Sequence, residues 1–392
     1  MKFATKAIHV GQKPEGAHGS VITPIYQTTT FAQTAPAELI GETGYDYSRA
    51  GNPTRTVLED VLASLESGAK AYAFSSGMAA LTTLVMALLN PGDEVIVTDD
   101  VYGGTFRLFD KVMNRFDIRA VYVDMDNADD LKAAVNDKTK MIFIETPTNP
   151  LLKLVDLEAV IKVAKDHNLI SVVDNTFASP YLQQPFEFGA DIILHSTTKY
   201  INGHSDVTGG ALILRDETYA DDIYFHQKSI GATPEPFAAW LTLRGTKTLA
   251  VRMENHVRSA QALAEFLEAH DEVEEVIYPG LRSHPQYEIA AKQMKGPGGM
   301  ISMRIKGGEQ EVRNFLKHLE FFTLAESLGG IESLIEIPAL MTHASIEPEV
   351  REKIGITDNL IRISVGIENL DDLRNDLDQA LKKKHENIQK VA

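Results

Sequence analysis

The chain has 392 residues, of which 44% are hydrophobic, and its formal net charge is −17. This length predicts more than one subdomain, and the negative charge argues against nucleic acid or an anionic membrane as a partner. Because the chain has no cysteine, disulfides, thiolate metal sites and a cysteine nucleophile are excluded. Its apolar runs are shorter than the roughly 20 residues of a membrane span. No secretory signal is recognisable near the start, so we expect a cytoplasmic protein.

Three regions follow one another along the chain. Residues 1–52 are rich in Gly, Thr and Pro and lack a clear period, which predicts an extended arm that reaches a neighbouring subunit. Residues 53–245 are expected to form an α/β domain, because short β-rich runs alternate with amphipathic helices as in a mainly parallel sheet. The strands expected in this domain are 71–74, 94–98, 119–123, 141–145, 170–174, 191–195 and 211–214.

Residues 246–392 are expected to form a smaller α+β domain. A long helical stretch covers 246–268. Shorter helices are expected near 309–316 and 370–382, and strands near 299–304, 322–325 and 360–365.

The segment from His195 to Lys199 follows an apolar strand, where open α/β sheets bind ligands. The Lys199 amine could condense with a carbonyl, while the hydroxyls of Ser196 and Thr198 could bind a phosphate. Alone, a lysine after a strand is more often a solvated loop residue. His195, His204 and Asp206 fit no familiar metal-ligand spacing, so no metal is expected.

Three further features lie at predicted strand ends. Asp174 ends an apolar strand and could pair with a protonated ring nitrogen, although a turn or cap aspartate explains it equally well. The small residues from Ser75 to Ala80 begin a helix whose amides suit a phosphate, but they match neither a P-loop nor a dinucleotide fingerprint. Tyr102 could stack on a heteroaromatic ring or simply pack. Together with Lys199, these features suit one planar, phosphorylated aldehyde.

Over nearly its whole length the chain resembles the transsulfuration enzymes, which are pyridoxal 5'-phosphate (PLP) enzymes of fold type I. This resemblance implies an aspartate aminotransferase-like α/β fold, PLP as the cofactor, an amino-acid substrate and a homotetramer. The matching motifs are Tyr45 to Arg49, Gly51 to Arg55, Ser75 to Ala80, Tyr102 to Thr105, Glu145 to Pro150, Asp174 to Thr176, His195 to Lys199, Gly203 to Asp206, Ala325 to Gly329 and Met341 to Ala344.

The resemblance also implies roles for single positions. Lys199 would hold PLP as a Schiff base and move protons, Asp174 would pair with the ring nitrogen, and Tyr102 would stack on the ring and assist catalysis. The positions implied for the phosphate are Gly77, Met78, Ser196 and Thr198, with Tyr47 and Arg49 from a neighbouring subunit. The positions implied for the substrate are Asn149 and Arg362 at its α-carboxylate, Ser327 and Thr342 as supports, and Glu326, Asp46, Arg107 and Arg49 at its distal groups.

Within this family the residues favour cystathionine γ-lyase activity, which gives cysteine, 2-oxobutanoate and ammonia. Family β-lyases tend to have bulky aromatic residues around position 327, where this chain has Glu326 and Leu328. Methionine γ-lyases usually have a cysteine where it has Gly104. Cystathionine γ-synthase remains the alternative because it shares the acidic residues. A non-catalytic α/β binding protein is the alternative from another class, and Lys199 with Asp174 argues against it.

Overall fold

The computed structural model describes residues 1–41, 44–344 and 347–385. Its larger sheet has seven strands in the order β3-β9-β8-β7-β6-β4-β5. Strand β9 runs antiparallel to both of its neighbours, β3 and β8, and the other paired strands of this sheet are parallel. Each of the seven predicted strands is present, which confirms the mainly parallel α/β fold. The strands are β3 (Lys70–Phe74), β4 (Glu94–Thr98), β5 (Arg119–Val123), β6 (Thr139–Glu145), β7 (Ile170–Asp174), β8 (Ile192–His195) and β9 (Gly210–Leu214).

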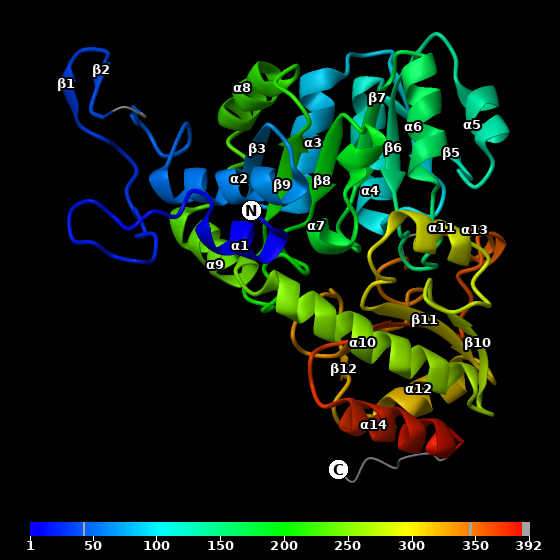
Figure 1. Ribbon diagram of the computed structural model, residues 1–392. Helices are drawn as coiled ribbons and strands as arrows, with labels where there is room; N and C mark the ends of the chain where they lie inside the picture. Colours follow the sequence, from blue (N-terminus) through cyan, green and yellow to red (C-terminus); the bar gives the residue numbers. More distant parts are fainter. Residues whose placement is uncertain (42–43, 345–346, 386–392) are drawn as a thin grey trace.

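Helices cover both faces of this sheet (Figure 1). Side chains alternate along a strand, so Ala71 and Ala73 pack with α2 (Pro53–Glu66), whereas Tyr72 and Phe74 pack with α3 (Gly77–Leu88). The remaining helical segments of this region are α4 (Gly103–Arg107), η1 (Leu108–Val112), η2 (Met113–Phe116), α5 (Ala128–Ala134), α6 (Leu157–Asp166), α7 (Ser179–Leu182), η3 (Pro185–Phe188), α8 (Ala220–Ile230) and α9 (Pro236–Thr246).

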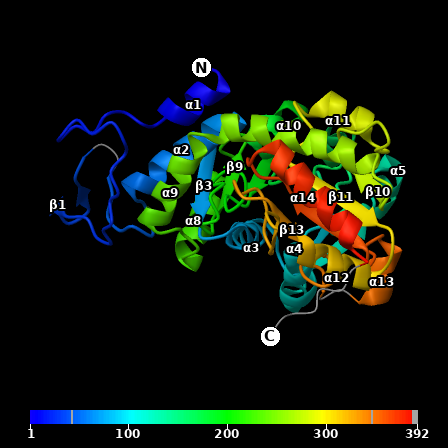
Figure 2. The same ribbon diagram turned by 90° about the horizontal axis from the view of Figure 1, so that it is seen from below.

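Residues 1–52 were expected to form an extended arm. Their first residues instead form a helix, α1 (Phe3–His9). It is held on the body by the buried Ala7, by the Phe3 ring against Tyr181 at 5.1 Å, and by Lys6 Nζ, which donates to the Ser64 carbonyl at 3.0 Å. The chain then runs away from the body as an extended segment with a short hairpin, β1 (Gln33–Ala35) and β2 (Glu38–Leu39) (Figures 1 and 2).

A second sheet of five strands, in the order β10-β11-β14-β13-β12, forms the smaller region. Of its strands, β10 and β13 were not predicted, because β10 buries only one of its five residues and β13 has only three residues. The strands are β10 (Val273–Ile277), β11 (Met300–Ile305), β12 (Thr323–Leu324), β13 (Leu334–Glu336) and β14 (Leu360–Ser364), and the helices are α11 (Tyr287–Gln293), α12 (Glu309–His318), α13 (Pro348–Lys353) and α14 (Leu370–Lys383).

One long helix, α10 (Leu249–Glu268), joins the two regions (Figure 1). Its beginning, with Leu249 and Met253, packs into the core of the larger region. Its end, with Leu263 and Leu267, packs into the core of the smaller one. The two sheets are therefore linked by a continuous rigid element. No helix in the described residues is long and apolar enough to cross a membrane.

Candidate active site

A cavity of about 390 Å³ lies at the carboxyl ends of the parallel strands, between the two sheets. This volume falls within the range of ordinary small-molecule sites. The larger region contributes the segments after β3, β4, β6, β7 and β8, and the smaller region contributes residues 326–328, Thr342 and Arg362. The strand ends that the sequence singled out therefore do meet at one site.

Lys199 reaches this cavity from the turn after β8, and its Nζ donates to Ser327 Oγ at 2.9 Å. Burial, followed by the positive charge of Arg362, lowers the pKa of the Lys199 amine to about 8. A larger share of the amine is then deprotonated near neutral pH, which makes it a nucleophile and a base. Ser327 has a φ of +86°, which is rare for a residue other than glycine.

Two carboxylates lie side by side at the ends of β6 and β7, because Glu145 and Asp174 are partners in the register of the sheet. Burial raises the pKa of Asp174, whose Oδ1 accepts from the Thr176 amide at 3.0 Å. The pKa of Glu145 is raised well above its ordinary value by burial and then by the charge of Asp174. A cationic group beside Asp174 would offset this cost of burying its charge.

The start of α3 forms the other end of the cavity. The Ser76 hydroxyl caps this helix by accepting from the Ala79 amide at 2.9 Å. A Cβ at Gly77 would lie 3.0 Å from Ser196 Cβ, so the glycine lets the helix start approach the turn after β8. Gly77, Met78, Ser196 and Thr198 all line the cavity. The helix start and the Ser196 hydroxyl therefore lie where a phosphate could be bound, while Thr198 Oγ1 exchanges hydrogen bonds with the Gly209 backbone.

Arg362 lies on the side of the smaller sheet and is only 2% exposed. Its Nη1 donates to Asn149 Oδ1 at 2.8 Å, and its Nη2 donates to the Ser327 carbonyl at 2.8 Å. Glu336, its partner across β13 and β14, forms an ion pair with it at 2.9 Å and also accepts from Thr342 Oγ1. Asn149, Ser327, Thr342 and Arg362, which were all predicted for the substrate, thus lie together at the cavity.

Two acidic residues of this site were not predicted. Glu145 ends an apolar strand as Asp174 does, so the same signal could have identified it. Its Oε2 accepts from the Tyr102 amide at 3.0 Å and thereby fixes the start of the segment that carries the Tyr102 ring into the cavity. Glu336 lies in a three-residue strand with no local pattern that distinguishes it.

Four predicted positions do not line the cavity of this single chain. Tyr47 is 42% exposed, and the Arg49 guanidinium lies 5.4 Å from the centre of its ring. Asp46 is exposed and its Oδ1 accepts from the Tyr47 amide at 2.6 Å. Arg107 is exposed at the end of α4. Glu326, in contrast, is exposed at the cavity.

The residues present fit PLP. Lys199 offers a reactive amine, Asp174 offers a buried carboxylate for a ring nitrogen, and the start of α3 offers a site for an anion at the opposite end. These groups surround a space of suitable size, and they lie on the sheet edge where α/β folds bind ligands. The fold and the site together define a PLP-dependent enzyme of fold type I.

Comparison with known proteins identifies the family of PLP-dependent enzymes to which the chain is similar. Residues 4–382 match the family model of Cys/Met metabolism PLP-dependent enzymes. The chain is 54% identical to cystathionine gamma-lyase of Dictyostelium discoideum (97% of this chain, 98% of the relative) and 53% identical to cystathionine beta-lyase of Lactococcus lactis subsp. cremoris strain MG1363 (97% and 99%). It is 44% identical to the cystathionine gamma synthase of Xanthomonas oryzae pv. oryzae solved with cystathionine (TM-score 0.95, 99% and 100% covered).

The chain therefore belongs to the Cys/Met metabolism PLP-dependent enzyme family. PLP is its cofactor, and the chain is an enzyme of cysteine and methionine metabolism. These relatives bear the names of three different activities, so the choice among them depends on the site.

Proposed function

We propose that this chain is a cystathionine γ-lyase that converts L-cystathionine to cysteine, 2-oxobutanoate and ammonia. The observation that carries the proposal is the polarity of the cavity, with Arg362 at one side and the exposed carboxylate of Glu326 at another. The substrate has a carboxylate and an ammonium at each end, so Arg362 suits its α-carboxylate and Glu326 its distal ammonium. The segment 326–328 contains no aromatic residue that would close this space.

The proposed cofactor contacts are made by residues that line the cavity. Lys199 would bind the PLP aldehyde, Asp174 would pair with the ring nitrogen and the Tyr102 ring would stack on the cofactor. The amides of Gly77 and Met78 and the hydroxyls of Ser196 and Thr198 would bind the phosphate. When bound, PLP supplies an electron-accepting ring that stabilises negative charge at the substrate α-carbon.

The remaining chemistry is assigned to side chains of this chain. Arg362, held by Asn149, fixes the substrate carboxylate with a planar bidentate fork. Lys199, whose amine has a pKa of about 8, would take the proton from the α-carbon and release it. The neutral amine would then take a proton from the β-carbon and give it to the sulfur that leaves the γ-carbon as the thiol of cysteine. Ser327 Oγ holds the Lys199 amine at 2.9 Å in its resting position. Tyr102 assists proton transfer.

The site is completed in an oligomer under this proposal. Tyr47 and Arg49 would contact the phosphate of a second copy, because the arm extends away from its own body (Figure 2). Asp46 would reach the distal ammonium of the substrate from the same arm. Arg107 remains assigned to the distal carboxylate. We place the enzyme in the cytoplasm as a homotetramer built from two active dimers.

Product analysis tests the activity. PLP-loaded protein is incubated with L-cystathionine, and separately with an acylated homoserine plus cysteine. Cysteine with 2-oxobutanoate as the main products supports the proposal, whereas homocysteine with pyruvate indicates β-cleavage. Predominant cystathionine formation in the second mixture indicates a γ-synthase, and no reaction in either indicates a binding protein.

A charge variant tests the role of Glu326. Glu326→Gln should raise KM for L-cystathionine about fivefold, since one exposed charge attraction is lost. The matched control is Glu332→Gln, which neutralises an exposed carboxylate of the same loop that binds Ser205 Oγ at 3.0 Å. Equal effects of the two variants would contradict the assignment.

A further inference from the structure

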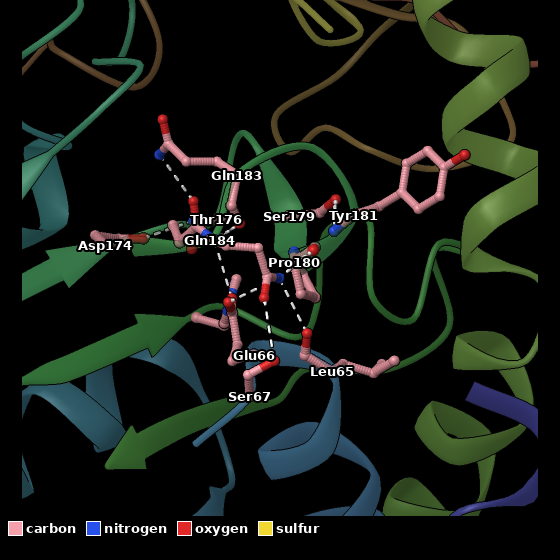
Figure 3. A network of polar contacts seen from close by, with 12 residues as sticks. Leu65, Glu66, Ser67, Asp174, Thr176, Ser179, Pro180, Tyr181, Gln183 and Gln184 are labelled. Carbon is pink, nitrogen blue, oxygen red and sulfur yellow. Dashed lines mark hydrogen bonds and ion pairs between the residues drawn. The ribbon is translucent and has the colours of Figure 1, made fainter. Parts of the chain in front are cut away.

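A buried polar network lies close to Asp174, which lines the cavity at the end of β7 (Figure 3). The carboxylate of Glu66, the last residue of α2, is at its centre and is 1% exposed. Its Oε1 accepts from Asn175 Nδ2 at 2.9 Å and is hydrogen-bonded to His195 Nε2. Its Oε2 accepts from Gln184 Nε2 at 3.5 Å. A carboxylate buried this deeply depends on such partners.

The two strand-end partners of Glu66 are direct neighbours of residues that line the cavity. Asn175 follows Asp174, and His195 precedes Ser196. Adjacent side chains in an extended chain point to opposite sides, so Asp174 and Ser196 face the cavity. Asn175 and His195 are turned towards Glu66. One carboxylate therefore ties together the two strand ends that carry opposite parts of the cofactor site.

A second layer extends the network to β6. Asn175 Oδ1 accepts from Gln183 Nε2 at 3.0 Å, and the same amide group donates to the Thr146 carbonyl at 3.2 Å. Thr146 follows Glu145, the third strand-end residue of the cavity. Gln183 Oε1 in turn accepts from Gln293 Nε2 at 3.1 Å. The network thus fixes the relative positions of three consecutive strand ends.

The network also acts on Asp174 through charge. Burial raises the pKa of Asp174, whereas hydrogen bonds from Thr176 and, after them, the electrostatic effect of His195 lower it. Glu66 is the carboxylate hydrogen-bonded to this ring, and both side chains are 1% exposed. Because charges interact strongly where water is excluded, a change at Glu66 reaches Asp174 without touching the cavity.

We propose that Glu66 is a positioning residue for the cofactor, because it holds Asn175 and His195 and so fixes Asp174 relative to Ser196. The cofactor then meets a ring-nitrogen site and a phosphate site whose separation is set before it binds. This inference rests on the cofactor contacts of the proposed function.

The test compares PLP binding to apoprotein variants. Glu66→Gln keeps the shape of the side chain and an acceptor for Asn175, but removes the negative charge beside His195. Its affinity for PLP should fall about tenfold, the expected effect of losing a charge-assisted hydrogen bond. The visible circular-dichroism band of the bound cofactor should also change, because the band reports how the ring is held.

A control separates positioning from a general loss of stability. Gln293→Ala removes hydrogen bonds at the outer end of the network, where Gln293 also donates to the Val155 carbonyl at 3.0 Å. It should lower the melting temperature yet leave PLP affinity and the dichroism band unchanged. If Glu66→Gln is too unstable to purify, His195→Gln provides the same comparison from the other side of the pair.

The outcomes separate this inference from the proposed function. If Glu66→Gln and His195→Gln bind PLP with wild-type affinity and an unchanged band, Glu66 has a purely structural role and the inference is wrong. The same conclusion follows if Gln293→Ala reproduces their effects. If the wild-type protein itself binds no PLP, the proposed function fails first.

Discussion

Lys199 owes its reactivity to its surroundings. Burial and the charge of Arg362 lower the pKa of its amine to about 8, while Glu336 and Glu326 oppose this shift. Glu336 is also the ion-pair partner of Arg362 at 2.9 Å, so the two buried charges act on the amine in opposite directions. Arg362, proposed to bind the substrate carboxylate, and Lys199, proposed to react, are therefore linked electrostatically.

This link predicts the pH dependence of the amine in the apoprotein. Only the deprotonated amine reacts with an acylating reagent, so the rate of Lys199 acylation should level off above pH 8 instead of rising to the ordinary lysine pKa of 10.5. Glu336→Gln should move the inflection to lower pH, because the neutral side chain no longer raises the pKa. The measurement is peptide mass spectrometry after brief labelling at several pH values, and a wild-type inflection near 10.5 would contradict the assignment.

Among the strands and helices, the sequence predicted those whose positions are determined by a local residue pattern. Buried parallel strands are short continuous apolar runs, so β6 with Met141 to Ile144 was recognisable before any contact was known. The edge strand β10 has a largely exposed pattern and was missed. Helix α1 was missed because its seven residues become helical through contacts with distant segments, such as Ser64.

The same distinction applies to the site. Lys199 and Asp174 were predicted because each follows or ends an apolar strand, and the resemblance to a known family then gave them roles. Glu336 and Glu66 could not be predicted, since their partners Arg362 and His195 are distant in sequence and are brought together only by the packed sheets. Pairs of residues from different elements can be identified only in a three-dimensional structure.

The whole molecule raises the question of how many chains form one site. The cavity is enclosed by both regions of a single chain, yet Tyr47 and Arg49 lie on the extended arm outside it. Their assignment to a neighbouring site requires the arm to cross between subunits, as closed symmetric oligomers allow.

Mixing two defective variants tests this sharing. Lys199→Ala and Arg49→Ala should each have little activity alone. After joint refolding, about a quarter of wild-type activity should return, because half of randomly mixed dimers are hybrids and each hybrid has one complete site. Mixtures that stay as inactive as the separate variants would show that both residues serve the same subunit.

The proposed function depends above all on which lysine binds PLP. The direct measurement is to load the protein with PLP, reduce it with borohydride and map the modified peptide by mass spectrometry, using Lys199→Ala as the control. We predict a single phosphopyridoxyl group on Lys199 in the wild type and none in the variant. A label on another lysine, or an equal label in Lys199→Ala, would contradict the assignment of Lys199 as the residue that binds PLP.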